Sequence, residues 1–237
     1  MLSGKCALIS GGGRGIGRES ALVLARHGAN VAVLARSESE IHDVATEVKG
    51  LGVRGLAIPA DVTIQKDVSR ALETVLREFA ALDILVNSAG VCFKASFEQT
   101  TDEMWDSSIG VNLRGAFRLA RAVYAHMCAQ GSGSIINISS ECGIVGKANL
   151  TAYCASKFGL NGFTKALAEE GRVFGVRCNA ICPTGVATRL RAETHPSEDP
   201  STIMQPADVA NVVLFLASDL SKHVTGQAIE VSLVHYR

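Results

Sequence analysis

The sequence lacks the charge pattern and the long apolar segments that mark nucleic-acid-binding and membrane-spanning proteins. It has 23 basic and 23 acidic side chains, so its formal net charge is +0, and no basic stripe is visible. This balance argues against a nucleic-acid partner. The first apolar run, residues 6–9, is too short for a secretion signal, and no run approaches the roughly 18 residues of a membrane-spanning helix. We therefore expect a soluble, cytoplasmic protein with no membrane or nucleic-acid partner.

The sequence also lacks clustered cysteines and histidines. Its seven cysteines include no CxxC pair, and its six histidines include no HxxxH or HExxH spacing. A disulfide framework favours an even number of cysteines in a small secreted chain, and a zinc site needs clustered ligands. We expect reduced, buried thiols and no metal site. Cys92, Cys142 and Cys154 fall near the candidate site, where small apolar wall groups are the simplest interpretation.

Short apolar runs alternate with longer amphipathic segments, and 47% of the 237 residues are hydrophobic, enough for a large core. The short runs predict strands at residues 5–10, 30–35, 56–59, 83–87, 134–139, 176–181 and 227–231. Helical spacing between them predicts helices at residues 15–27, 38–49, 64–79, 101–129, 152–171 and 206–218. This pattern predicts an α/β, three-layer Rossmann fold in one domain over residues 1–237, with a seven-stranded parallel sheet covered by helices on both faces.

A glycine-rich turn joins the first predicted strand to the first predicted helix. Residues 10–17 read SGGGRGIG, with the spacing GxxxGxG in place of GxGxxG. Glycines let the backbone approach a pyrophosphate, and the start of a helix offers free N–H groups and the positive end of its dipole. Such a turn alone is a weak signal, but its place between an apolar strand and a helix strengthens it. We expect Gly11, Gly15 and Gly17 to bind a dinucleotide.

The end of the second predicted strand indicates which dinucleotide is bound. An NAD-binding chain carries Asp or Glu there to bind the ribose hydroxyls, whereas this chain has Ala35 and Arg36. Arg14 lies close by in the glycine-rich turn. Two guanidinium groups and no carboxylate suit a 2′-phosphate, although Arg36 could also be a solvated residue at the start of a helix. We expect NADP(H) as the preferred cofactor, with NAD(H) possible.

Further motifs follow the turn along the chain. Residues 87–90 read NSAG, residues 153–157 read YCASK, and Ser140 stands thirteen residues before the tyrosine. Asn112 and Pro183 complete the pattern. Together with the turn, these segments resemble the TGxxxGxG, NNAG and YxxxK motifs of the short-chain dehydrogenase/reductase family, of the single-domain, 3-oxoacyl-[acyl-carrier-protein] reductase-like type. The resemblance covers nearly the whole chain and implies an oxidoreductase acting on CH–OH donors and their carbonyl counterparts.

Tyr153 and Lys157 stand four residues apart on one predicted helix, and therefore on the same face. A phenol has a pKa of about 10, and a nearby ammonium lowers it; reaching neutrality needs about 4 kcal/mol of differential stabilisation. Tyr153 would then exchange a proton with a carbonyl oxygen that Ser140 holds by a hydrogen bond. The alternative is an exposed helix pair without chemistry, and Ser139 is the competing serine.

The resemblance also assigns cofactor contacts and a fourth catalytic residue. It implies that Asn112 interrupts its helix and holds a water that relays protons to Lys157, which also binds the nicotinamide ribose. It implies that Ile16 meets the pyrophosphate or the nicotinamide ribose, and that Asp61 and Val62 flank the adenine. Asp61 fits a helix cap equally well. The remaining implied contacts are Asn87, Ala89 and Gly90 at the adenosine ribose, and Pro183, Val186 and Thr188 at the nicotinamide.

Two departures from the family pattern bear on the structure. Thr184 stands where a glycine is usual, so the backbone there cannot take a positive φ cheaply. The DGG-like ending of the family is absent after Glu230, and in relatives that tail helps to form the oligomer. We still expect a homodimer or a homotetramer, with the helices at 101–129 and 152–171 forming the dimer face.

The motifs define a reaction type and leave the substrate open. We expect an NADP(H)-dependent enzyme that interconverts a small-molecule carbonyl and its alcohol, either 3-oxoacyl-[acyl-carrier-protein] reductase-like or a general carbonyl reductase. An alcohol or sugar dehydrogenase working oxidatively is one alternative, and a catalytically silent dinucleotide-binding sensor is another. The intact set of Ser140, Tyr153 and Lys157 argues against a silent protein. The polar segment 191–205 is expected to form a loop, with His195 in solvent.

Overall fold

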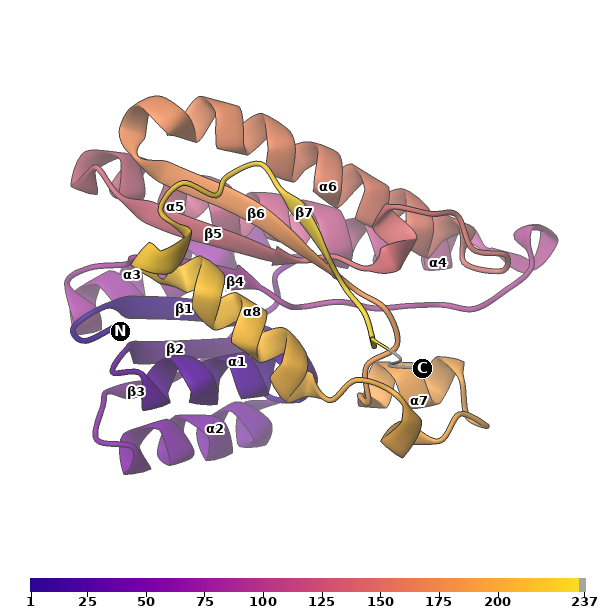
Figure 1. Ribbon diagram of the computed structural model, residues 1–237, viewed down its shortest axis with the longest axis horizontal. Helices are drawn as coiled ribbons and strands as arrows, with labels where there is room; N and C mark the ends of the chain where they lie inside the picture. Colours follow the sequence, from indigo (N-terminus) through magenta and orange to yellow (C-terminus); the bar gives the residue numbers. More distant parts are fainter. Residues whose placement is uncertain (235–237) are drawn as a thin grey trace.

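A seven-stranded sheet forms the centre of the computed structural model, which describes residues 1–234 (Figure 1). The strands are β1 (Cys6–Ser10), β2 (Asn30–Ala35), β3 (Gly55–Pro59), β4 (Ile84–Asn87), β5 (Gly133–Ile138), β6 (Val176–Pro183) and β7 (Ala228–Val231). All neighbouring pairs are parallel, in the order β3-β2-β1-β4-β5-β6-β7. This confirms the predicted sheet. The family's DGG-like ending is absent after Glu230, and the last residues of this segment, 235–237, lie outside the described residues.

Helices cover both faces of the sheet and divide the core in two. One face packs against α1 (Gly15–Arg26), α2 (Glu38–Gly50) and α8 (Pro206–Ala217), and the other against α3 (Gln65–Phe79), α5 (Ala116–Gln130) and α6 (Thr151–Gly171). Figure 1 shows α1 and α8 in front of the sheet and α3 and α5 fainter behind it. Along β1, Ala7 and Ile9 enter the first core and Cys6 and Leu8 the second, because successive side chains of a strand point to opposite faces. Within residues 1–234, no helix combines the length and apolarity needed to cross a membrane.

The strand order reverses at β1, which lies between β2 and β4. In doubly wound sheets this position leaves a crevice at the carboxyl ends of the strands. Ser10 fixes the backbone there, because its Oγ accepts hydrogen bonds from Ser88 N (3.2 Å) and Ala89 N (3.4 Å). At the end of β4, Asn87 Nδ2 donates to Asn137 Oδ1 of β5 (2.8 Å). The turn after β1 and the loop after β4 are thereby held side by side.

The long helix predicted at residues 101–129 is interrupted in the structure. It consists of α4 (Asp102–Ser108), a π-helical segment (Ile109–Gly115) and α5. Asn112 lies in the π-helical segment, where its Oδ1 accepts a hydrogen bond from Val91 N (2.8 Å). Its Nδ2 donates to Val91 O and to Ser156 Oγ (2.9 Å each). Such a widened turn is frequent at functional sites, and it is the interruption that the family resemblance implies.

The polar segment predicted as a loop contains helical turns, so that prediction is wrong. The helix α7 spans Arg189–Thr194, and a 3-10 turn follows at Pro200–Thr202. Thr188 begins α7, because its Oγ1 accepts a hydrogen bond from Arg191 N (3.3 Å). Arg191 also forms a bidentate ion pair with Glu198 (2.6 and 2.7 Å), which ties the helix to the chain that follows it.

Candidate active site

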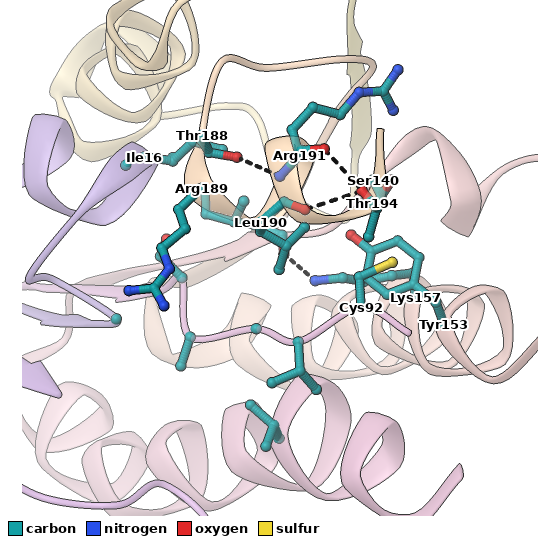
Figure 2. Close-up of a pocket in the computed structure, with 18 of the residues that line it drawn as sticks. Ile16, Cys92, Ser140, Tyr153, Lys157, Thr188, Arg189, Leu190, Arg191 and Thr194 are labelled. Carbon is teal, nitrogen blue, oxygen red and sulfur yellow. Dashed lines mark hydrogen bonds between the residues drawn. The ribbon is translucent and has the colours of Figure 1, made fainter. Parts of the chain in front are cut away.

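A cavity of about 980 Å³ runs along the carboxyl ends of the strands. Its walls come from the turn between β1 and α1, the start of α2, the loops after β3, β4 and β5, the first half of α6, and α7. These segments are far apart in the sequence, and the sheet gathers them at one edge because all its strands point the same way. Figure 2 shows the part of the cavity where α7 lies above Tyr153 and Lys157 of α6, the two residues that the sequence predicts to be catalytic.

The glycine-rich turn has the close backbone approach and the free N–H groups that a pyrophosphate requires. Gly11 has a φ of 65°, and a Cβ on it would lie 2.7 Å from Ala89 N. A Cβ on Gly17 would collide with the Gly11 carbonyl oxygen. The helix α1 begins at Gly15 with no side-chain cap from Arg14 and no acidic residue in its first turn, so its first N–H groups stay available. The pyrophosphate of a dinucleotide fits this cradle.

The next part of the cavity holds the residues predicted to meet the adenosine. Arg14, Arg36 and Asp61 line it as predicted. The end of β2 carries no carboxylate, as the sequence shows, but Glu40 also lines this part of the cavity, with Oε1 3.5 Å from Arg14 Nη1. Glu40 was missed because it stands one helical turn beyond the strand end. Asp61 Oδ1 also accepts hydrogen bonds from the turn that follows it (2.7 and 2.8 Å), so it caps that turn as well.

The opposite end of the cavity brings Ser140, Tyr153 and Lys157 together (Figure 2). Ser140 follows β5, whereas α6 presents the other two on one face, with Lys157 Nζ 5.6 Å from the centre of the Tyr153 ring. Lys157 Nζ donates a hydrogen bond to Ile138 O (2.8 Å). Ser140 Oγ accepts one from Cys142 N (3.1 Å). The three predicted catalytic side chains therefore share one site.

Burial dominates the electrostatics of this site. Burial raises the pKa of Tyr153, and a hydrogen bond with Ser140 opposes this effect. Burial also lowers the pKa of Lys157 from 10.5 to about 8. In the protein chain by itself, burial therefore outweighs the lowering of the Tyr153 pKa that Lys157 is expected to cause, and a pKa near neutrality in the complete site stays a prediction. At neutral pH the Tyr153 hydroxyl keeps its proton, which is the state that can donate to a carbonyl oxygen.

Most of the predicted cofactor contacts line this cavity, and the exceptions lie just behind its wall. The lining residues among them are Gly11, Arg14, Gly15, Ile16, Arg36, Asp61, Val62, Ala89, Gly90, Tyr153, Lys157, Pro183, Val186 and Thr188. Gly17, Asn87 and Asn112 are buried behind these residues. Because the side chain of Asn112 is engaged with Val91 and Ser156, it supports the wall, and its water relay stays a prediction.

The neighbours of the predicted catalytic residues support the site or line its wall. Ser139 Oγ donates to Lys157 O (3.4 Å), so this serine supports α6, in keeping with the choice of Ser140 as the catalytic one. Cys92 and Cys142 line the cavity. Burial raises the pKa of Cys92 to about 12 and that of Cys142 to about 11, so both thiols stay protonated at neutral pH. These two cysteines lie in the wall as the sequence predicted, whereas Cys154 is buried and does not line the cavity.

The contribution of α7 was missed from the sequence. Leu190 and Thr194 line the cavity beside Ser140 (Figure 2). His195 lines the same end of the cavity and is half-buried, so its predicted place in solvent is wrong. Burial lowers the pKa of His195, which makes the imidazole neutral near pH 7. The capping threonine before α7 and the Arg–Glu spacing within it were the available signals for this helix.

A dinucleotide cradle that opens onto a Ser–Tyr–Lys site defines a class of enzyme, the nicotinamide-dependent oxidoreductases that act on alcohols and carbonyl compounds. Comparison with known proteins supplies the family. The family model for short chain dehydrogenases matches residues 5–199, which is most of the chain. The chain belongs to the short-chain dehydrogenase family, and it is an NAD(P)-dependent oxidoreductase acting on CH–OH donors.

Similar proteins match over almost the whole chain. The 3-oxoacyl-[acyl-carrier-protein] reductase FabG of Staphylococcus aureus is 37% identical over 237 residues, covering 96% of both chains. The crystal structure of the 3-ketoacyl-(acyl-carrier-protein) reductase of Brucella melitensis complexed with NADH has a TM-score of 0.91 and 32% identity, covering 98% of both chains. A solved structure from Beutenbergia cavernae, named for NAD(P)-dependent gluconate 5-dehydrogenase activity and holding NADP at low occupancy, has a TM-score of 0.91 and 34% identity. It covers 98% of this chain and 96% of that one.

Proposed function

We propose that this chain is a carbonyl reductase that prefers NADP(H) and reduces 3-oxoacyl thioesters or related small ketones in the cytoplasm. The observation that carries the proposal is one continuous cavity that joins the phosphate cradle to Ser140, Tyr153 and Lys157. The printed names of the reductases from Staphylococcus aureus and Brucella melitensis support the substrate class. The half-buried α7 end of the cavity offers a place for the acyl part of such a substrate.

The catalytic side chains divide the reaction among them. When bound, the nicotinamide supplies the hydride for reduction. Tyr153 donates its hydroxyl proton to the carbonyl oxygen, and Ser140 holds that oxygen with a hydrogen bond from its Oγ, which stabilises the charge that develops. Lys157, oriented by Ile138 O at 2.8 Å, stabilises the phenolate left on Tyr153 and would hydrogen-bond the ribose. Asn112 keeps the loop after β4 and the helix α6 in register for this arrangement.

The proposed cofactor preference rests on Arg14 and Arg36 at the adenosine end of the cavity. A 2′-phosphate carries nearly two negative charges, and guanidinium groups bind it through charge-assisted hydrogen bonds. Each such bond contributes about 1.5–3 kcal/mol, and the lower value corresponds to about a tenfold preference. We therefore assign NADP(H) as the preferred cofactor and NAD(H) as a weaker alternative.

A substrate panel with both cofactors tests this proposal. We expect NADPH-dependent reduction of 3-oxoacyl thioesters, with kcat/KM about tenfold above that with NADH. Ketones, aldehydes, alcohols and sugars complete the panel, with oxidation followed as NADP⁺ reduction. A strong preference for oxidising a sugar acid would favour the dehydrogenase alternative, which the name of the Beutenbergia cavernae structure suggests. Cofactor binding without any turnover would favour a sensor.

We also propose that the enzyme is a homodimer, or a homotetramer built from such dimers, through α4, α5 and α6. Trp105 (42% exposed), Phe117 (39%) and Phe158 (46%) lie on these three neighbouring helices. Large exposed aromatic side chains on adjacent helices are typical of an interface. We expect light scattering to report a dimer or tetramer, and Phe158→Glu to shift it to monomer. Leu51→Glu, which changes an equally exposed side chain after α2, is the control; a monomeric unsubstituted protein would contradict the proposal.

A further inference from the structure

Glu40 occupies an unexpected place in the cofactor part of the cavity. It stands in the first turn of α2 and lines the adenosine end together with Arg14 and Arg36. A Cβ on Gly13 would lie 2.9 Å from Glu40 Cβ and 3.1 Å from its Oε2. The acidic side chain therefore packs directly on the phosphate-binding turn, on the side where the adenosine would lie.

The two arginines at this end differ in their surroundings. Arg14 Nη1 lies 3.5 Å from Glu40 Oε1, whereas Arg36 forms no ion pair with any described residue. The side chains of Arg14 and Glu40 are 54% and 36% exposed, so water and salt screen their attraction. The pair is weak enough for a stronger anion to displace the carboxylate from Arg14.

We infer that Glu40 limits how strongly this chain discriminates NADP(H) from NAD(H). A 2′-phosphate has to take Arg14 from Glu40 and meets the repulsion of a carboxylate beside it. A 2′-hydroxyl meets no such repulsion and can donate a hydrogen bond to the same carboxylate, as the strand-end acidic residue does in NAD-binding sheets. Glu40 therefore weakens NADP(H) binding, favours NAD(H) binding, and acts as a specificity-determining residue. This inference rests on the proposed binding of both cofactors at this end of the cavity.

Calorimetric measurement of the Kd of NADPH and of NADH tests the inference without relying on turnover. The variants are Glu40→Gln, which removes the charge and keeps the shape, and Glu38→Gln as the matched control. Glu38 is in the same helical turn, and its side chain is 70% exposed and paired with His42 away from the cavity. We expect Glu40→Gln to raise the ratio of Kd(NADH) to Kd(NADPH) about fivefold, as for removal of one exposed charge near a phosphate. Glu38→Gln should leave the ratio unchanged.

The possible outcomes separate this inference from the proposed cofactor preference. A Glu40→Gln protein with an unchanged or lowered ratio would overturn the inference, and so would equal changes in both Kd values, because Glu40 would then only support the turn. An equal response to Glu38→Gln would also overturn it, because the effect would be one of overall charge. The ratio in the unsubstituted protein tests the cofactor preference separately: tighter binding of NADH would contradict that preference, while the change caused by Glu40→Gln would still decide the role of Glu40.

Discussion

Replacing Tyr153 with phenylalanine is expected to lower kcat for carbonyl reduction by about 100- to 10,000-fold, the range typical for loss of a general acid. The substitution removes only the hydroxyl and keeps the ring, which lies 5.6 Å from Lys157 Nζ. Because the phosphate cradle at the other end of the cavity is unchanged, the Kd of NADPH should change little. The measurements are steady-state kinetics with the best substrate of the panel and fluorescence titration with NADPH.

Tyr124→Phe is the matched control for this experiment. Tyr124 lies on α5 and does not line the cavity, so the same chemical change there should leave kcat unaltered. Ser140→Ala is informative beside it, because Ser140 is proposed to hold the carbonyl oxygen and not to donate the proton. Turnover of Tyr153→Phe at the unsubstituted rate would remove Tyr153 from its role and leave another group to supply the proton.

The sheet could be predicted from the sequence because its strands are buried on both faces. Strands of a parallel sheet read as continuous apolar runs, as β1 does, and every residue of β1 is buried. The glycine-rich turn was equally clear, because its glycines are required by contacts within the turn and with the loop after β4. These signals are local, so the cradle and the order of strands and helices followed from residue patterns alone.

The features that were missed depend on contacts between segments far apart in the chain. Glu40 reads as an ordinary acidic residue at the start of a helix, and only the fold places it against the turn at Gly13. The helix α7 was mistaken for a loop because its residues are mostly polar, and a cap and ion pairs within the segment stabilise it. No sequence pattern reports how deeply these groups are covered once the chain has folded.

The direction of the pKa shift of Tyr153 also could not be predicted from the sequence. The four-residue spacing to Lys157 correctly predicts that the two side chains share a face, and from that spacing alone a lowered pKa follows. The structure instead buries both groups, and burial disfavours each charged form. The direction of the shift is set by solvent exposure, which is a property of the packed site and not of the spacing.

Replacing Lys157 with methionine is expected to stabilise the fold while removing activity. Lys157 is only 4% exposed, and lowering its pKa from 10.5 to about 8 corresponds to a cost of roughly 3 kcal/mol for the charged form at neutral pH. The variant loses the hydrogen bond from the charged ammonium to Ile138 O, which offsets about 1.5–3 kcal/mol. We expect the free energy of unfolding at pH 7 to rise by up to about 1.5 kcal/mol. We expect kcat/KM to fall by at least about 100-fold, because the phenolate on Tyr153 loses its cation.

The pH dependence of the free energy of unfolding tests whether the buried charge of Lys157 destabilises the fold. Between pH 8 and 10.5 the unfolded chain keeps the proton of Lys157 while the folded chain releases it, so the contribution of Lys157 to stability improves as pH rises. The gain in stability of the methionine variant should therefore be complete below pH 8 and fade as pH approaches 10.5.

Urea unfolding of both proteins at pH 7 and pH 10 measures this difference in the free energy of unfolding, in which the contributions of the other titrating groups cancel. Lys165→Met, on an exposed position of the same helix, is the control for the loss of a lysine side chain from α6. A variant destabilised equally at both pH values would mean that the buried ammonium supports the fold, and its retention would then need no catalytic explanation.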